Sequence, residues 1–550
     1  MEPFVDAVGW PDAYARRYRE SGYWQDRPLG DFLTEHAHTL GDRTALVTEH
    51  GSLTYSELER RAAALARGLT NLGLVRGDRI VVQLPNTEDF FVTLFACLRI
   101  GAVPVLGLPA YRRSEAVHLA RHSSAAAYVL PDTDSASGYD YRVLADEVRN
   151  AVPELRHVLV AGAPGRHTAL ATVEEAGEQA GGHPGSTELD PTAPAVLLVS
   201  GGTTGLPKLI PRTHNDYAYN IRASAQVCGF GPDTVYLAAL PAAHNFALAC
   251  PGALGTLLVG GTVILSPSPD PDTVFPIIER HKVTVTAVVP PLAALWSQAA
   301  EWSTEDLSSL TLLQVGGARL APDTARRVRA GLGCELQQVF GMAEGLLCLT
   351  RPGYAPERVD ATQGRPLCPD DELRVVDEDD RDVPPGETGE LLTRGPYTLR
   401  GYYRAEDHNK SAFTVDGFYR TGDLVRLTVD GDIVVEGRKK DLVNRGGDKV
   451  SADELEGHLR AHPDILDAAV VPVPDEYLGE RTCAWIVPRK DRPGLDVPGL
   501  DAFLETRGVA QYKKPDVVHI TDSLPVTSVG KVDKRTLGSR AAEHSGQPRH

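Results

Sequence analysis

The chain of 550 residues is long enough for at least two domains, and its 42% hydrophobic and 24% charged residues are ordinary for a soluble globular enzyme. Its formal net charge of −18 argues against nucleic acid as the main partner, because phosphate backbones are bound by basic surfaces. No run approaches the ~20 uninterrupted apolar residues that span a membrane, and no secretory signal is apparent.

Cysteine usage points to a reducing compartment. The sequence has seven cysteines and no CxxC pair. An odd, dispersed set of this kind is typical of free thiols, so we expect a cytoplasmic protein with neither a disulfide framework nor a zinc site. The seven are Cys97, Cys228, Cys250, Cys334, Cys348, Cys368 and Cys483.

Helical and strand patterns alternate to about residue 340. The run Ser56-Glu-Leu-Glu59 is typical of a capping box that opens a helix, and leucines follow it at helical spacing. Strands are predicted over 79–84, 127–130, 195–199, 262–265, 283–289 and 312–315. This alternation predicts an α/β architecture with largely parallel sheets.

The pattern changes from about residue 372, where short β-like runs at 372–376, 389–394 and 432–436 are separated by turns. We interpret them as an antiparallel subdomain that closes the large domain. The compact charged segment Gly437-Arg-Lys-Lys-Asp441 is the candidate hinge. The expected organisation is a large domain over 1–436, a hinge over 437–441, a small α+β domain over 442–540 and a disordered tail over 541–550.

A glycine-rich loop directly follows the predicted strand at 195–199. Its glycines allow close backbone approach to an anion, and its hydroxyl and ammonium groups add donors, so the composition is that of a phosphate-binding loop. It differs from a Walker loop because Leu-Pro separates its last glycine from the lysine. The candidate ligand-binding residues are Ser200, Gly201, Gly202, Thr203, Thr204, Gly205 and Lys208.

Four further signatures follow in order: Phe340-Gly-Met-Ala-Glu344, Tyr419-Arg-Thr-Gly-Asp423, Gly437-Arg438 with Asn444-Arg-Gly-Gly447, and Pro525-Val-Thr-Ser-Val-Gly-Lys531. With the loop, they resemble the adenylate-forming superfamily from about residue 25 to about residue 535. The resemblance implies a large N-terminal domain of two α/β subdomains plus a β-rich subdomain, and a small mobile α+β C-terminal domain. It also implies activation of a carboxylic acid by ATP.

The resemblance assigns roles to individual residues. Asp423 accepts hydrogen bonds from the ribose hydroxyls, Arg438 contacts ribose and phosphate, and Glu344 is associated with Mg²⁺, which prefers oxygen ligands. The nucleotide is expected to lie along Gly316, Gly317, Ala318, Gln338, Val339, Phe340, Gly341, Met342 and Ala343.

Three positions are tied to the two half-reactions. Lys531 is expected to bridge the substrate carboxylate and the α-phosphate during adenylation. Lys440 occupies the family's hinge position, about which the small domain rotates. After this rotation, Gly446 and Gly447 are expected to line the path of a pantetheine thiol.

The branch of the superfamily is indicated by three segments, Pro211–Asn215, Ala239–Gly252 and Gln337–Gly345, which resemble the standalone aryl-acid–AMP ligases of siderophore biosynthesis. Asn245, after the candidate catalytic residue His244, is a neutral amide that can bond an ortho phenolic hydroxyl and leaves no charge for an amine. A thiol at Cys250 suits a bare ring C–H better than a 3-hydroxyl. Salicylate is therefore the first expected substrate and 2,3-dihydroxybenzoate the second. The remaining pocket candidates are Phe246, Gly317, Gly341 and Leu346.

The sequence leaves more than one possibility for the thiol that accepts the acyl group and for the class of activity. Only about twenty residues follow Lys531, too few for a carrier domain, so the expected partner is the phosphopantetheine arm of a separate aryl carrier protein. Coenzyme A is the second possibility, which would make the chain an aryl-CoA ligase. A catalytically inactive adenylate-binding homologue is a third interpretation, and a luciferase-like oxygenase is supported by fold alone.

Overall fold

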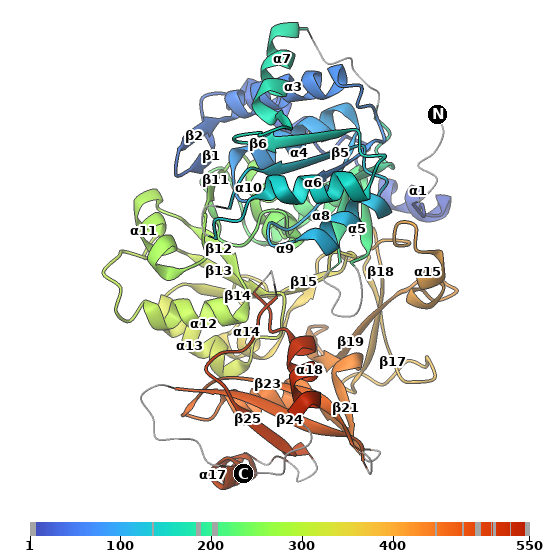
Figure 1. The fold of residues 1–550 in the computed structure, drawn as a ribbon. Coiled ribbons are helices and arrows are strands. Elements are labelled where there is room, and N and C mark those ends of the chain that lie inside the picture. The colour runs from blue at the N-terminus through green and yellow to red at the C-terminus, as the bar shows by residue number, and fades with distance from the viewer. Residues whose placement is uncertain are drawn as a thin grey trace.

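A computed structural model of the chain describes residues 7–134, 137–182, 189–200, 207–445, 448–475, 478–489, 497–507, 509, 513–527 and 530–544 (Figure 1). The described residues form four sheets, of seven, nine, four and five strands. The two large sheets make the α/β body, and the four-stranded sheet lies beside them. The five-stranded sheet belongs to the C-terminal domain at the bottom of Figure 1.

The seven-stranded sheet has the order β7-β6-β5-β3-β4-β8-β9, and only β9 runs antiparallel to its neighbour. Alternate residues of β3 and β5 pack on opposite faces, since Ile80 and Val82 face α3 and α4 whereas Val81 faces α5 and α6. Its strands are β3 (Arg79–Val82), β4 (Val103–Leu106), β5 (Ala127–Pro131), β6 (His157–Ala161), β7 (Thr168–Ala169), β8 (Pro194–Val199) and β9 (Leu209–Thr213). Its helices are α3 (Tyr55–Asn71), α4 (Glu88–Ile100), α5 (Arg113–His122), α6 (Tyr141–Ala151) and α7 (Leu170–Ala180).

The nine-stranded sheet has the order β16-β15-β14-β13-β12-β10-β11-β1-β2 and is parallel from β1 to β14. Its strands are β1 (Thr44–Thr48), β2 (Gly51–Thr54), β10 (Val235–Ala238), β11 (Thr262–Leu265), β12 (Val285–Val288), β13 (Leu312–Gly316), β14 (Glu335–Gly341), β15 (Leu347–Leu349) and β16 (Arg365–Pro366). Its helices are α8 (His214–Val227), α9 (Asn245–Ala249) and α10 (Gly252–Leu258) on one face, and α11 (Pro271–His281), α12 (Pro290–Ala299) and α13 (Pro322–Leu332) on the other.

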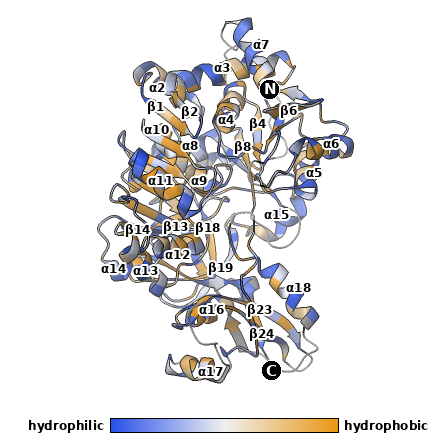
Figure 2. Cartoon of the chain, turned by 60° about the vertical axis from the view of Figure 1, so that its left-hand side comes forward, coloured by the Kyte–Doolittle hydropathy of each residue, from blue (hydrophilic) through white to orange (hydrophobic). Residues whose placement is uncertain are grey.

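Both large sheets are apolar inside. Figure 2 shows hydrophobic strands covered by helices whose outer faces are hydrophilic, as expected for parallel sheets buried on both sides. Four short helices complete the large domain: α1 (Asp12–Glu20), α2 (Asp31–Thr39), α14 (Pro356–Ala361) and α15 (Glu406–Ala412).

The four-stranded sheet is antiparallel throughout, as the change of pattern after residue 372 predicts. Its strands are β17 (Glu372–Val376), β18 (Gly389–Arg394), β19 (Tyr419–Leu427) and β20 (Ile433–Arg438). A 3-10 helix over Lys439–Asp441 then leads into the C-terminal domain.

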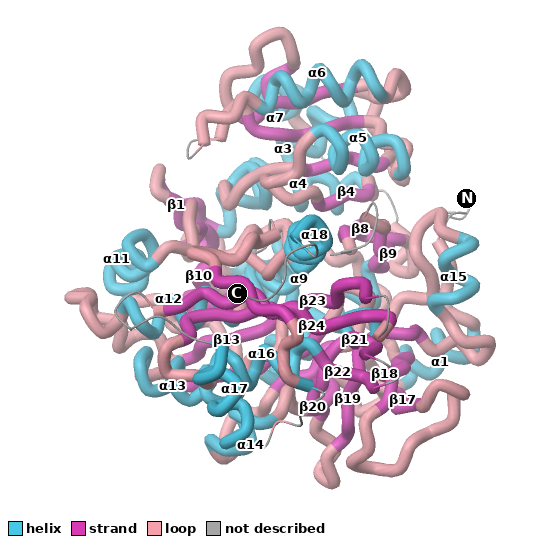
Figure 3. Tube along the Cα trace, turned by 60° about the horizontal axis from the view of Figure 1, so that its bottom comes forward, coloured by secondary structure: helices cyan, strands magenta, loops and turns pink. Residues whose placement is uncertain are grey.

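The C-terminal domain, which lies toward the viewer in Figure 3, is a mixed sheet with helices. Its strands are β21 (Leu442–Arg445), β22 (Asp448–Ser451), β23 (Ile465–Asp475), β24 (Gly479–Pro488) and β25 (Val517–Ile520). Its helices are α16 (Ala452–Arg460), α17 (Val497–Thr506) and α18 (Lys534–His544). The tail expected to be disordered from residue 541 is helical to His544, because Leu537 and Ala541 bury against β23 and β24.

One predicted helix start is wrong by two residues. The capping box of α3 is made by Thr54 and Glu57, not by Ser56 and Glu59. The Thr54 hydroxyl accepts from the Glu57 N–H at 3.1 Å, while the Glu57 carboxylate accepts from the Thr54 N–H at 2.8 Å. The pairs Thr54–Glu57 and Ser56–Glu59 have the same three-residue spacing. Strand β2 ends at Thr54, which places Thr54 at the N-cap of α3.

All seven cysteines are free and buried, in agreement with the absence of a disulfide framework. Among the described residues, no helix has the length and apolar character needed to cross a bilayer. In the same part of the chain, no group of three or more His, Cys, Asp or Glu side chains could hold a metal.

Candidate active site

The phosphate-loop candidates lie only partly within the described residues. Ser200 and Lys208 are paired at the mouth of the loop: the Ser200 N–H donates to the Lys208 carbonyl at 2.9 Å, and the Lys208 N–H donates to Ser200 Oγ at 2.9 Å. Lys208 Nζ is 5.6 Å from the centre of the Tyr402 ring. Gly201, Gly202, Thr203, Thr204 and Gly205 lie outside the described residues.

The end of β13 forms one wall of the site. Gly316 is buried, Gly317 is partly exposed with φ +82°, and Ala318 is exposed, so the chain rises from the core to the surface in three residues. A Cβ on Gly316 would lie 2.7 Å from the Val339 carbonyl oxygen and 3.0 Å from the Phe246 ring. Only glycine fits this close approach.

Lys531 reaches this wall from the C-terminal domain. A Cβ on Gly317 would lie 3.2 Å from Lys531 Cε and 3.7 Å from its Nζ, so the ammonium group is next to the Gly317 backbone. The Lys531 charge also acts on His244: burial is the main reason that the pKa of His244 falls to about 3, and Lys531 lowers it further. His244 is therefore a neutral imidazole at any working pH.

His244 and Asn245 begin the short helix α9. The N–H of Phe246 donates to His244 Nδ1 at 3.3 Å, which makes His244 the N-cap. The Asn245 side chain accepts from the Tyr217 hydroxyl at 2.8 Å and donates to Cys250 Sγ at 3.5 Å. Cys250 is buried, and burial raises the pKa of its thiol to about 12. Asn245, Phe246 and Cys250 thus lie together, as the sequence predicts.

Asp423 and Arg438 face each other across β19 and β20. They are register partners, and Arg438 Nε is 2.9 Å from Asp423 Oδ1. Burial raises the pKa of Asp423 although Arg438 opposes the shift, and the neighbouring Asp423 raises the pKa of Arg438. The Asp423 carboxyl group thus lies against the guanidinium of Arg438, and a carboxylate at this position can accept hydrogen bonds from hydroxyl groups.

Glu344 lies in the turn between β14 and β15, and the sequence did not indicate what holds it. The Tyr402 hydroxyl donates to Glu344 Oε1 at 2.7 Å and lies 2.9 Å from the Tyr419 hydroxyl. Glu344 also acts electrostatically on Asp423 and Arg438, so the three charged groups share one region. A tyrosine in a strand-and-loop segment gives no signal of such a role before the fold is known.

The β14 candidates divide between two sides of the strand. Val339 belongs to the apolar cluster that contains Phe246 and Cys250, whereas Phe340 packs toward the four-stranded sheet and Met342 contacts both clusters. Gly341 is exposed, and a Cβ there would lie 2.8 Å from the Leu347 side chain. The Ala343 carbonyl accepts from Arg212 Nη1 at 3.1 Å.

Two of the predicted site residues turn their side chains into the protein interior. The Gln338 side chain is 1% exposed and is committed to the fold, since it donates to the Val359 carbonyl at 2.6 Å and accepts from Gln363 at 2.9 Å. Leu346 is 0% exposed and packs in the core of the four-stranded sheet. Its neighbour Leu347 lies instead in the cluster with Phe246, because successive residues of an extended chain point to opposite faces.

The hinge candidate Lys440 lies in the 3-10 helix, and its side chain is outside the described part of the structure. Gly446 and Gly447 are outside the described residues as well. On the C-terminal side of the hinge, Ser451 Oγ donates to the Glu436 carbonyl at 2.9 Å.

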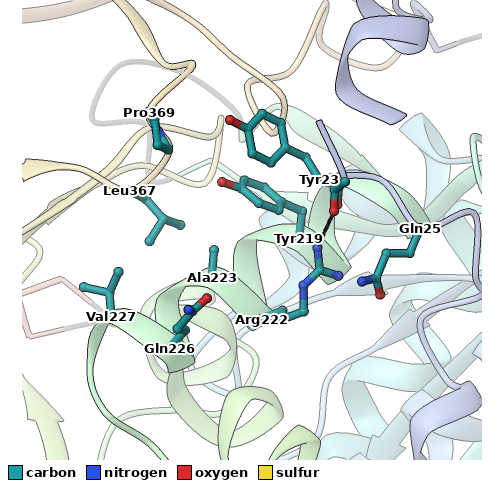
Figure 4. Close-up of a pocket in the computed structure, with 10 residues that line it drawn as sticks. Tyr23, Gln25, Tyr219, Arg222, Ala223, Gln226, Val227, Leu367 and Pro369 are labelled. Carbon is teal, nitrogen blue, oxygen red and sulfur yellow. Dashed lines mark hydrogen bonds between the residues drawn. The ribbon is translucent and has the colours of Figure 1, made fainter. Parts of the chain in front are cut away.

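A separate cavity of about 340 Å³ lies between α8 and the segment before β17 (Figure 4). Arg222 crosses it and donates to the Tyr23 carbonyl at 2.9 Å. None of the predicted site residues lines this cavity, so we do not assign the substrate to it. Its lining residues are Gly22, Tyr23, Gln25, Tyr219, Arg222, Ala223, Gln226, Val227, Leu367 and Pro369.

Comparison with known proteins matches residues 33–403 to the AMP-binding enzyme family and residues 454–531 to the AMP-binding enzyme C-terminal domain. The chain is 52% identical to 2,3-dihydroxybenzoate-AMP ligase of Bacillus subtilis (strain 168), over 97% of each chain. It is 50% identical to salicyl-AMP ligase / salicyl-S-ArCP synthetase of Mycobacterium tuberculosis, over 96% of this chain and 94% of that one. The apo structure of Mycobacterium smegmatis MbtA has a TM-score of 0.75 at 49% identity and covers 98% of this chain and 99% of its own.

Proposed function

Because this chain belongs to the AMP-binding enzyme family, we propose that it converts an aryl carboxylic acid and ATP to aryl-AMP and pyrophosphate, with salicylate as the first substrate and 2,3-dihydroxybenzoate as the second. The chain is an adenylating ligase, as its relatives are. The observation that carries the proposal is the position of Lys531 against Gly317, next to Gly316, whose Cα faces the Phe246 ring in the cluster with Asn245 and Cys250.

The first half-reaction joins two anions. A carboxylate oxygen of the acid attacks the α-phosphorus of ATP, and the bond to the β-phosphate oxygen breaks as pyrophosphate leaves. The Lys531 ammonium would neutralise the carboxylate and the α-phosphate and hold them in line. His244 stays neutral beside it, so it adds no charge that would compete for the carboxylate. Asp423 would accept the ribose hydroxyls and so fix the nucleoside.

The side chains around Glu344 fit a magnesium ion that is shared with the nucleotide. Mg²⁺ in nucleotide sites is usually held by one or two carboxylates plus phosphate oxygens, not by a protein cage. Among the described residues, Glu344 Oε1 has a hydrogen-bond partner in Tyr402 and Oε2 has none, which leaves one oxygen for such an ion. When bound, the ion would neutralise charge on the phosphates.

The acid would be chosen by the polar end of the pocket. Asn245 carries no charge, which disfavours amino acids because their ammonium group would have no counter-ion. Cys250 offers sulfur, a weak hydrogen-bonding partner, to the ring position that carries the 3-hydroxyl of 2,3-dihydroxybenzoate. A buried hydroxyl left poorly satisfied costs ~1–3 kcal/mol, which favours salicylate.

The second half-reaction would pass the aryl group to a thiol. The thiol sulfur attacks the adenylate carbonyl carbon, a thioester forms, and AMP leaves. We propose the phosphopantetheine arm of a separate aryl carrier protein in siderophore biosynthesis as the acceptor, which the names of the relatives support. Gly446 and Gly447 would line its path.

ATP–pyrophosphate exchange across a panel of acids tests the proposal. The panel is salicylate, 2,3-dihydroxybenzoate, benzoate, 3-hydroxyanthranilate, 3-hydroxypicolinate and several amino acids. Exchange led by salicylate supports both the activity and the role of Cys250. Exchange led by dihydroxybenzoate keeps the activity and refutes that role, and the absence of exchange with every aryl acid refutes the proposed function. Faster thioester formation with coenzyme A than with carrier protein would refute the proposed acceptor.

A further inference from the structure

The pocket amide of Asn245 is held from behind by a residue that no motif indicated. Tyr217 lies on α8, is fully buried, and donates its hydroxyl proton to Asn245 Oδ1 at 2.8 Å. Asn245 Nδ2 then points to Cys250 Sγ, 3.5 Å away. The amide oxygen of Asn245 therefore bonds to Tyr217, and the amide nitrogen bonds to Cys250.

The chemistry of Tyr217 distinguishes the two possible orientations of this amide. In the described part of the chain, the Tyr217 hydroxyl has its hydrogen-bond partner in Asn245. If the amide were reversed, Nδ2 would donate to the phenol oxygen, and the buried phenol proton would have no acceptor. A buried donor without a partner is costly, so the orientation with Oδ1 toward Tyr217 is favoured.

Arg212 reinforces this direction. Its guanidinium carbon is 4.7 Å from the centre of the Tyr217 ring, and the side chain is 1% exposed. Asp216 holds Arg212 by an Nε–Oδ1 contact of 2.6 Å, and the Ala343 carbonyl holds it at 3.1 Å. A cation fixed over the ring withdraws electron density from the phenol and makes its O–H a stronger donor.

The amide has two N–H groups, and sulfur takes one of them weakly, which leaves a donor for the ligand. An acid with an ortho acceptor suits this donor. In salicylate the phenol proton bonds internally to the carboxylate, so the phenol oxygen is available to accept. In anthranilate the amine nitrogen has its lone pair delocalised into the ring and accepts poorly.

We propose that Tyr217 is a positioning residue that fixes the Asn245 amide with its N–H toward the ortho substituent, so that the pocket selects aryl acids whose ortho atom accepts a hydrogen bond. This inference rests on the proposed function and extends it to the chemical class of the ortho group. Tyr217 acts through Asn245, without contact to the reacting carboxylate or the phosphate.

The test uses pyrophosphate exchange of the full chain with salicylate, anthranilate and benzoate. In Tyr217→Phe, the amide loses its fixed orientation, so kcat/KM for salicylate is expected to fall about five- to tenfold while that for benzoate changes less than about twofold. Tyr219→Phe is the matched control, because Tyr219 is a buried tyrosine on the same helix that lines the other cavity (Figure 4). Its salicylate-to-benzoate ratio is expected to equal that of the native enzyme.

The outcomes separate the two proposals. A native enzyme that prefers anthranilate over salicylate would refute the assigned amide orientation, and this measurement needs no variant. An equal fall for salicylate and benzoate in Tyr217→Phe would show a merely structural role and refute the inference, although the enzyme remains an aryl-acid ligase. Only a native enzyme without exchange for any aryl acid refutes the proposed function itself.

Discussion

Cys250 is a buried thiol at the polar end of the proposed substrate pocket, where a hydroxyl would be a stronger hydrogen-bonding partner. Its Sγ lies 3.5 Å from Asn245 Nδ2, a long contact that suits sulfur. The neighbouring helix α9 supplies Asn245, so a change at Cys250 alters the ligand's surroundings and the amide's at once.

Cys250→Ser is expected to move the preference from salicylate toward 2,3-dihydroxybenzoate by about tenfold in the ratio of kcat/KM values, because the serine hydroxyl can bond the 3-hydroxyl. Pyrophosphate exchange with both acids measures this ratio. Cys334→Ser is the matched control, since Cys334 is also buried but belongs to a different core cluster. An unchanged ratio in Cys250→Ser would remove Cys250 from the specificity argument.

Asp371, a buried residue outside the site, makes the free energy of unfolding depend on pH. Asp371 accepts from the Tyr397 hydroxyl at 2.7 Å and from the Cys368 N–H at 3.0 Å, but its Oδ1 has no hydrogen-bond partner in the described residues. Burial raises the pKa of Asp371 from 3.8 to about 7. The folded state thus binds this proton more tightly than the unfolded state.

It follows that the free energy of unfolding falls as the pH rises from about 4 to about 7, since the folded carboxyl must then ionise. Asp371→Asn cannot ionise, so its advantage in stability over the native protein is expected to grow with pH, from roughly 1.5 kcal/mol at about pH 5 to roughly 4 kcal/mol at about pH 8. Urea unfolding at both pH values measures the difference. Equal pH dependence in the two proteins would contradict the assignment.

At the scale of elements, strand ends place the charged groups. A register shift between Leu424 and Val425 brings Leu424 opposite Gly437 and Asp423 opposite Arg438. β13 ends at Gly316, and Gly317 turns with φ +82°, which side chains rarely adopt. The turn lets Lys531 lie against the backbone.

Gly317→Ala tests this turn. The new Cβ would meet Lys531 Cε at 3.2 Å and Val289 Cγ1 at 3.5 Å, so pyrophosphate exchange is expected to fall at least ~tenfold. Gly333→Ala controls for backbone strain, because Gly333 also has a positive φ, of +66°, and no atom lies within 4 Å of its Cβ position. The control should lose stability, by roughly 1–2 kcal/mol, and keep its exchange activity. Equal losses of exchange in both variants would contradict the role of the turn.

At the scale of the whole molecule, the described orientation of the C-terminal domain is the one that the proposed role of Lys531 in adenylation requires. Lys531 meets Gly317 and acts on His244, and Arg507 Nη2 lies 3.9 Å from Asp323 Oδ2 on α13. The second half-reaction has no need of Lys531 if the domain rotates about the hinge.

Lys531→Ala is therefore expected to reduce adenylate formation by at least ~10²-fold and to change thioester formation from presynthesised adenylate by less than about threefold. Single-turnover assays of each half-reaction measure the two effects. Lys513→Ala is the control, because Lys513 lies in the same domain and pairs with Glu454 at 2.7 Å. Equal loss in both half-reactions would contradict the two-orientation mechanism.

Much of this architecture could be predicted from the sequence, because strands β11, β17 and β18 coincide with apolar runs bounded by turn residues. Ordered motifs likewise indicated Lys531, Asp423 and Arg438. The supports of the site could not be predicted: Tyr402 meets Glu344 across 58 residues, and Tyr217 meets Asn245 across 28. Such contacts depend on how distant elements pack, and a lone tyrosine carries no local signal.

The burial of all seven cysteines has a practical consequence for observing this protein at work. Thiol dyes react with exposed thiolates, and burial raises the pKa of Cys97, Cys228 and Cys483 to about 12. The folded protein thus exposes no native thiol that would react with a maleimide. A pair of cysteines introduced at exposed positions on either side of the hinge, such as Val415 and Ile520, could carry two fluorophores without removal of any native thiol. Energy transfer between them would report the proposed domain rotation during turnover.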